Sequence, residues 1–129
     1  MGRTTINAMC AVFPGAVDTD PWGDGHDAWK VGGKMFACMG ASDDGVSVKT
    51  DSIETATMLI DAGVGRKARY FHRSWINLPL DCAEDQLWQR LVVSYRIVRS
   101  ALPARVRAEL PPEEDPALLH SRYRAARTG

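Results

Sequence analysis

The sequence predicts an α+β domain, a two-layer sandwich in which an antiparallel sheet has helices packed on one face. Three observations lead to this fold class: a Gly-Gly hairpin signal, further runs of β-branched and aromatic residues, and amphipathic helical patterns before, between and after them. The predicted order is helix, three or more strands, helix, strand and long helix. This order is typical of an antiparallel sheet covered by helices on one face.

A β-hairpin over residues 26–40 is the clearest local prediction. The segment 26–39 reads HDAWKVGGKMFACM. Gly32 and Gly33 supply the positive φ angles that a two-residue type I′ turn requires, so the apolar runs on either side fold back on each other. The register then pairs Val31 with Lys34, Lys30 with Met35, Trp29 with Phe36, and Ala28 with Ala37.

One face of this hairpin is expected to be buried. Because side chains alternate along a strand, Trp29 and Phe36 share a face, which we expect to be the core face. An aromatic cross-strand pair stabilises a sheet by roughly 0.2–1 kcal/mol more than a pair of alanines. Lys34 belongs to the same face, close to the turn. The opposite face carries Lys30 and five other residues, of which the two methionines are also candidates for burial: His26, Ala28, Met35, Ala37 and Met39.

A short helix and a third strand are predicted on either side of the hairpin. Residues 5–13 have apolar side chains at helical spacing after Thr4 or Thr5 as the N-cap, and the following Pro-Gly pair ends the run. After the hairpin, residues 42–45 read SDDG, which is typical of a turn. The run VSVKT that follows is predicted to be a strand with its two valines on one face.

The second half of the chain predicts a helix, a strand and a longer helix. Asp51 and Asp81 each precede a glutamate by three residues and are expected to act as N-caps, and Gly63 is the expected stop of the first of these helices. Residues 69–80 are rich in aromatic residues and predict a strand. The last helix extends to about residue 102, and its inner stripe consists of Leu87, Leu91, Ser94, Tyr95, Val98 and Leu102.

Length, charge and cysteine usage limit the class of protein. The 129 residues suit one domain, which we place at residues 1–110, followed by an appendage at 111–129 that contains a short helix from Pro116 to Arg127 or is disordered. The net charge is zero, with 16 basic and 16 acidic residues, so a strongly electrostatic polyanion binder is not expected. The three cysteines are widely spaced, and no apolar run reaches the ~20 residues of a membrane span. We therefore expect a reduced, cytoplasmic protein, a monomer or weak dimer.

Several short motifs together resemble the MmcQ/YjbR family. They occur in the order FPGA, an acidic pair with PWG, WKVGGKMFA, VSVKT-D, YFHRSWINL, and SY before ALP. The resemblance runs from about Ile6 to Leu110 and implies a fold similar to the CyaY (frataxin) topology. Members of the family are often described as DNA-binding because of a proposed double-wing arrangement. Where a lysine is expected upstream of Trp75, this chain has His72-Arg73-Ser74. The matching positions are Pro14, Gly15, Trp22, Gly23, Lys30, Gly32, Gly33, Lys34, Phe36, Lys49, Trp75, Ser94 and Tyr95.

The segment 66–73, RKARYFHR, is the best candidate for a binding site. Its basic side chains can neutralise phosphates, and Tyr70 and Phe71 can stack on exposed bases. The alternative is a solvated loop that enters a strand whose aromatic residues are in the core. If the segment lies beside the outer hairpin face, Lys30 and Lys49 extend its basic surface. The candidate nucleic-acid-binding residues are Lys30, Lys34, Lys49, Arg66, Lys67, Arg69, His72 and Arg73.

Other chemistry is weaker in the sequence. The acidic loop at 18–27 lacks the spacing and the final glutamate of an EF-hand, and neither a catalytic constellation nor a cofactor motif is recognised. We therefore expect a non-catalytic binding domain without a metal or cofactor, and the family resemblance implies DNA as its partner. The alternative is a module that binds a protein or a small molecule with Trp22, Trp29 and Trp75.

Overall fold

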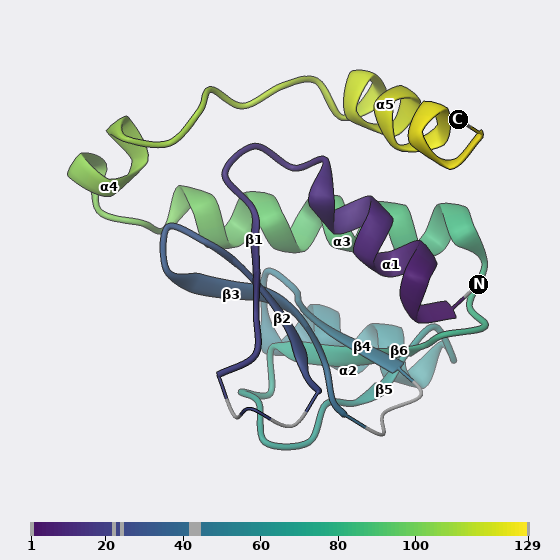
Figure 1. Cartoon of the computed structure of the whole chain (residues 1–129). Coiled ribbons are helices and arrows are strands. Elements are labelled where there is room, and N and C mark those ends of the chain that lie inside the picture. The colour runs from purple at the N-terminus through teal and green to yellow at the C-terminus, as the bar shows by residue number, and fades with distance from the viewer. Residues whose placement is uncertain (1, 22, 24, 42–44, 129) are drawn as a thin grey trace.

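The computed structural model describes residues 2–21, 23, 25–41 and 45–128. Their antiparallel sheet is six-stranded, with the strand order β1-β2-β3-β4-β6-β5. The α+β prediction is confirmed, and Figure 1 shows α1 and α3 over the sheet. The predicted turn at 42–44 and Trp22 lie outside the described residues. In chain order the elements are α1 (Gly2–Ala11), β1 (Val17–Thr19), β2 (Asp27–Val31), β3 (Lys34–Met39), β4 (Gly45–Lys49), α2 (Ile53–Asp61), β5 (Arg66–Lys67), β6 (Trp75–Pro79), α3 (Glu84–Ser100), α4 (Ala104–Ala108) and α5 (Pro116–Thr128).

The hairpin of β2 and β3 forms with the predicted turn but changes register partway along. Val31 pairs with Lys34 as predicted, and the register then shifts between Trp29 and Lys30, so that Trp29 pairs with Ala37. The predicted pairing of Trp29 with Phe36 is therefore wrong. A β-bulge places Phe36 as an extra residue in β3, which exchanges the faces of the residues after it.

The bulge changes which side chains of β3 enter the core. Phe36 is fully buried, as expected, but Ala37 and Met39, predicted on the outer face, also join the core cluster. Cross-strand pairing aligns Trp29, Ala37, Val48 and Ile76 in one row across β2, β3, β4 and β6, and paired residues share a face. This row defines the helix-covered face of the sheet.

Ser94 of α3 completes the hydrogen bonding where the bulge interrupts the sheet. Its hydroxyl donates to the Phe36 carbonyl oxygen at 2.6 Å and accepts from the Lys49 backbone N–H at 2.9 Å. The register of β3 and β4 would otherwise bring these two backbone groups together, because Ala37 pairs with Val48. The hydroxyl thus bridges the ends of two strands, and both buried groups keep a partner.

The long helix α3 has the predicted inner stripe. All six predicted residues, including Leu102 just beyond the helix, are buried. The ring of Tyr95 stacks on Phe13 with centroids 4.7 Å apart and meets Phe36 edge-on at 5.4 Å. The Tyr95 hydroxyl donates to the Pro14 carbonyl oxygen and accepts from Arg99. This helix therefore joins the bulged strand to the segment after α1.

Helix ends follow the prediction less closely than helix cores. Ser52, not Asp51, is the N-cap of α2, because the Ser52 hydroxyl accepts from the Thr55 backbone N–H at 3.0 Å. Asp81 does not cap α3, which begins after Ala83 without a side-chain cap. The first helix starts at Gly2, three residues before the predicted start. Gly63 follows the C-cap of α2 with φ +78°, so this stop is confirmed.

The C-terminal helix α5 lies against α1 and the start of α3 (Figure 1). Leu119 and Tyr123 are buried there, and the Tyr123 ring stacks on Trp88 at 6.1 Å between centroids. Arg127 forms an ion pair of 2.7 Å with Glu84 at the start of α3. The division of the chain at residue 110 stays a prediction, and the structure adds that Leu119 and Tyr123 of the segment after it belong to the core cluster.

Candidate nucleic-acid interface

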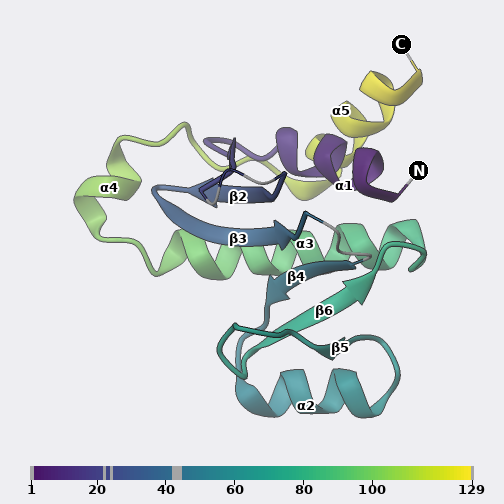
Figure 2. The ribbon, with the colours of Figure 1, turned by 60° about the horizontal axis from the view of Figure 1, so that its bottom comes forward.

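The sheet face opposite the core row carries polar and basic side chains. Asn77 pairs with both Ser47 and Arg66 across β4, β6 and β5, so the three share this face. The Asn77 amide nitrogen donates to the Ser47 hydroxyl at 3.1 Å, and its oxygen accepts from Arg66 Nε at 2.8 Å. Because α1, α2 and α3 all contribute to the core cluster, this face carries none of the described helices, and we call it the open face although Ser47 and Asn77 are themselves buried; it is turned toward the viewer in Figure 2. The chain of hydrogen bonds fixes the Arg66 guanidinium on it.

A loop at 68–74 connects β5 to β6 where a continuous strand was predicted. Only 75–79 of the predicted strand 69–80 is extended in β6, because two turns replace its first part. The Phe71 backbone N–H donates to the Ala68 carbonyl oxygen at 3.4 Å, and the Trp75 N–H donates to the His72 carbonyl oxygen at 2.9 Å. Thr50 anchors the loop, since its backbone N–H and hydroxyl donate to the Ser74 carbonyl oxygen at 2.8 and 2.6 Å.

Ser74 also orients two basic side chains at the base of this loop. Lys49 Nζ donates to the Ser74 hydroxyl oxygen at 3.0 Å, and that oxygen lies 2.9 Å from His72 Nδ1. The Ser74 backbone N–H donates to the same Nδ1 at 3.1 Å, so this nitrogen is an acceptor and the proton of a neutral His72 is on Nε2. Lys49, Ser74 and His72 therefore form one hydrogen-bonded chain.

Aromatic side chains occupy the same end of the sheet. Phe71 stacks on Trp75 with ring centroids 4.6 Å apart and an interplanar angle of 28°, and both side chains are half-buried. Tyr70, by contrast, is 100% exposed and has φ 70°, a left-handed conformation that is uncommon for a tyrosine. The alternative in which the aromatic residues of 66–73 are in the core is therefore wrong for Tyr70.

The structure brings together most, but not all, of the predicted basic residues. Lys49 and Arg66 lie on the open face, and Arg69, His72 and Arg73 are exposed on the loop beside it. Within the part of the chain that the structure describes, Arg69 and Arg73 have no carboxylate partner.

Three further basic residues lie apart from this group. Lys30 lies on the open face but on β2, two strands from β4. Lys34 pairs with the core residue Val31 and Lys67 pairs with Ile76, so both lie on the helix-covered side.

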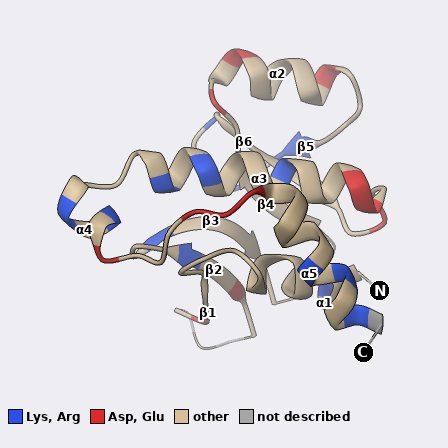
Figure 3. Ribbon diagram, turned by 90° about the horizontal axis from the view of Figure 1, so that it is seen from above, with Lys and Arg blue, Asp and Glu red and all other residues tan. Residues whose placement is uncertain are grey.

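Charge is distributed unevenly over the molecule. The segment 62–80 contains no aspartate or glutamate. In Figure 3, β5 is blue, as are parts of α3, α4, α5 and the β2–β3 hairpin, whereas red residues mark both ends of α2, the start of α3, the linker between α4 and α5 and one end of β2. A chain of zero net charge therefore still presents a local basic surface, formed by Arg66 of β5 and the following loop.

Sequence reasoning missed the side chains that hold this surface in place. Ser47, Ser74 and Asn77 are buried polar residues. Ser74 bonds to Lys49, which is 25 residues away in the chain, and Asn77 bonds to Ser47, which is 30 residues away. The alternation in WINLP does place Trp75 and Asn77 on one face. The alternation does not indicate which of the two faces the helices cover.

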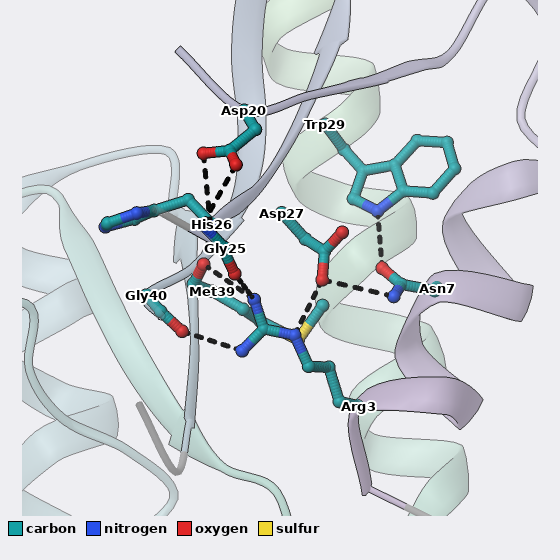
Figure 4. Close-up of polar contacts among 9 residues, drawn as sticks. All are labelled: Arg3, Asn7, Asp20, Gly25, His26, Asp27, Trp29, Met39 and Gly40. Carbon is teal, nitrogen blue, oxygen red and sulfur yellow. Dashed lines mark hydrogen bonds and ion pairs between the residues drawn. The ribbon is translucent and has the colours of Figure 1, made fainter. Parts of the chain in front are cut away.

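A second polar cluster joins α1 to the start of β2 (Figure 4). Arg3 Nε donates to the Asp27 carboxylate at 2.6 Å, and its terminal nitrogens donate to the carbonyl oxygens of Gly25 and Gly40 at 2.6 and 2.7 Å. Asn7 donates to Asp27 at 3.3 Å and accepts from the Trp29 indole N–H at 2.8 Å. All of these partners are protein groups, so the hydrogen bonds fix α1 to the start of β2 and the end of β3.

Asp18 and Asp27 share one side of this cluster and titrate differently. Partial burial, together with the nearby Asp27 carboxyl, raises the pKa of Asp18 from 3.8 to about 6. Burial opposes ionisation of Asp27 as well, but hydrogen bonds from Asp18, Arg3 and Asn7 outweigh it and lower the pKa of Asp27. The pair is therefore stable when Asp18 holds a proton that it donates to Asp27.

Other candidate chemistry finds little support in the geometry. Among the described residues, no group of three or more His, Cys, Asp or Glu side chains is placed to hold a metal ion. Burial raises the pKa of the Cys10 thiol well above its usual value, which disfavours the reactive thiolate. No helix in the described part of the chain is long and apolar enough to span a bilayer.

Two of the three tryptophans proposed as a binding set, Trp29 and Trp75, lie on opposite faces of the sheet. Trp29 lies on the helix-covered face and Trp75 on the open face. A depression of about 430 Å³ lies elsewhere, between the start of α1 and residues 80–87, and is lined by Gly2, Leu80, Cys82 and Leu87 among others. Neither Trp29 nor Trp75 lines this depression.

Fold and surface together define a two-layer α+β domain with an open, partly basic sheet face. Residues 11–97 match the YjbR family, and the chain belongs to this family. The fold is similar to that of the Deinococcus radiodurans protein DR2400, whose crystal structure contains a DUF419 domain, with a TM-score of 0.73 and 23% sequence identity over 85% of this chain and 89% of that one. At this level of identity the likeness concerns the fold alone. None of the curated proteins compared matches the sequence.

Proposed function

We propose that the protein is a non-catalytic DNA-binding domain that contacts its ligand with the open sheet face and the loop between β5 and β6. The observation that supports this function best is the grouping of Lys49 on β4 with Arg66, Arg69 and Arg73, which belong to a segment free of acidic residues that also carries exposed and half-buried aromatic rings. Cationic side chains release counterions when they contact phosphates, which gives affinity without requiring a particular sequence.

The two free arginines of the loop are the main source of affinity in this proposal. Lys49 and Arg66 are held by hydrogen bonds to Ser74 and Asn77, so they lose little conformational freedom on binding. Arg69 and Arg73 have no carboxylate partner among the described residues and are free to reach phosphates. With few cations available, binding should be weak and should depend strongly on salt.

Fluorescence anisotropy with labelled DNA at ~50 mM salt tests the proposal, because phosphate contacts are strongest at low salt. The double variant Arg69→Gln/Arg73→Gln should bind more weakly, and its plot of log K against log salt should be shallower by roughly one unit for each arginine removed. The matched control is Arg90→Gln/Arg96→Gln, which removes the same charge from α3 on the other side of the sheet. Equal losses in both variants, or no binding by the wild type, would contradict the proposed function.

A further inference from the structure

Tyr70 is the side chain for which the fold offers no structural use. It is 100% exposed, so neither face of its ring packs against the protein. It also occupies the third position of the turn closed by Ala68 and Phe71, with φ 70°, where glycine would be favoured. A bulky residue in such a conformation is strained, and strain of this kind is often found at binding sites.

The base of the loop holds Tyr70 in a defined position. Thr50 donates two hydrogen bonds to the Ser74 carbonyl oxygen, and the turn from His72 to Trp75 follows directly. Phe71, next to Tyr70, is fixed by stacking on Trp75 at 4.6 Å between centroids. The anchored turn fixes the backbone that carries the ring, so little backbone freedom remains to be lost on binding.

The surroundings of the ring match one kind of ligand. Arg69 precedes Tyr70 and Arg73 follows three residues later, both exposed, so in the sequence two cations flank an aromatic ring that is free on both faces. A single-stranded nucleic acid presents the same combination, with unpaired bases between phosphates. In a duplex the bases already stack on one another, so that only their edges and the backbone are accessible.

We propose that the loop between β5 and β6 binds single-stranded DNA in preference to duplex DNA, with the Tyr70 ring stacked on an unpaired base and Arg69 and Arg73 on the flanking phosphates. This inference rests on the proposed function and specifies its ligand. The half-buried rings of Phe71 and Trp75 provide a second apolar surface beside the first base. Lys49 and Arg66 continue the basic surface along the open face.

Binding of an oligothymidylate of about 16 nucleotides and of a duplex of the same length, by the whole protein, tests the preference. Tyr70→Ala should weaken binding to the single strand by about 5- to 100-fold, the usual range for loss of one stacked base, and should change duplex binding by less than about twofold. Tyr70→Phe keeps the ring and should bind the single strand as the wild type does. Tyr70→Gly should bind weakly although its melting temperature is equal or higher, because glycine relieves the positive φ.

The possible outcomes separate the two proposals. A preference for the single strand that is lost in Tyr70→Ala and kept in Tyr70→Phe supports the inference. If the wild type binds both DNAs equally, or if Tyr70→Ala weakens both equally or neither, the inference is overturned while DNA binding itself stands. If neither DNA binds, both proposals fail.

Photocrosslinking gives an independent readout that a purely structural role would not affect. A single strand that carries 5-iodouracil should crosslink to Tyr70, because this base reacts with an aromatic ring against which it stacks. Mass spectrometry of the crosslinked peptide should locate the link within 69–73. Crosslinks confined to other aromatic residues would overturn the assignment of Tyr70.

Discussion

Replacing Gly32 with alanine should destabilise the protein more than the same replacement at Gly33, the next residue of the hairpin turn. Both glycines have positive φ, 57° and 82°. Their surroundings differ, because a Cβ on Gly32 would come within 2.5 Å of Leu102 Cδ1 and 3.0 Å of Val106 Cγ1, whereas a Cβ on Gly33 has no atom within 4 Å. Comparing the two glycine variants therefore separates the cost of backbone strain from the cost of crowding Leu102 and Val106.

The magnitudes follow from these two terms. A left-handed conformation costs a non-glycine residue roughly 1–2 kcal/mol, and this cost is common to both variants. The lower flexibility of alanine in the unfolded chain offsets about 0.4–1 kcal/mol of it at both sites. Overpacking adds roughly 1–3 kcal/mol at Gly32 alone. We take the lower half of that range, since Leu102 ends in methyl groups that can turn, and expect Gly32→Ala to lose about 1–2 kcal/mol more than Gly33→Ala.

Urea denaturation followed by far-UV circular dichroism measures the difference. At a slope of about 2 kcal/mol per molar urea, the middle of the usual range, the midpoint of Gly32→Ala should lie roughly 0.5–1 M below that of Gly33→Ala. A double-mutant cycle with Leu102→Ala isolates the packing contribution. Gly32→Ala should destabilise the Leu102→Ala variant less than it destabilises the wild type, because the clashing side chain has been removed. Equal midpoints for the two glycine variants would refute the proposed packing of the turn against Leu102.

Two further predictions concern hydrogen bonds and protonation. Ser94→Ala should destabilise the protein by about 2–4 kcal/mol, because the Phe36 carbonyl and the Lys49 N–H would both be left without a buried partner; an unchanged urea midpoint would contradict this role. Asp18 has a folded-state pKa raised to about 6, so its contribution to stability is present below pH ~4 and is lost as the pH rises toward 6. Asp18→Asn, whose amide can donate to Asp27 at any pH, should therefore raise the melting temperature at pH ~7.5 more than at pH ~4.5; equal effects at both pH values would count against the shared proton.

The sequence predicted those parts of the fold that depend on local pattern. The turn at Gly32–Gly33, the buried stripe of α3 and the stop at Gly63 follow from backbone preference and helical periodicity. The bulge in β3 could not be predicted in this way. The backbone carbonyl that it leaves unpaired at Phe36 accepts from the Ser94 hydroxyl, which is 58 residues away in the chain. The N-cap of α2 could not be assigned from sequence either, because the adjacent residues Asp51 and Ser52 are both favourable N-caps.

The candidate site was predicted in composition but not in geometry. The basic and aromatic character of 66–73 is visible in the sequence, yet the richness in aromatic residues suggested a strand where Tyr70 and its neighbours form turns. Strand propensity takes no account of the hydrogen bond from Thr50 to the Ser74 carbonyl oxygen, which anchors a loop at this point. The face on which each lysine lies depended on register and on which side the helices pack, and both are tertiary properties.

Chemical-shift mapping by NMR tests the central claim most directly, namely that the open sheet face and its loop bind nucleic acid. Titration of the labelled protein with single-stranded DNA should shift the amide signals of 68–75, with smaller changes at Lys49, Arg66 and Asn77. The signals of α1 and α5, which lie across the sheet from this face, should remain in place (Figure 1). Shifts confined to α1 and α5, or no shifts at all at low salt, would contradict the claim.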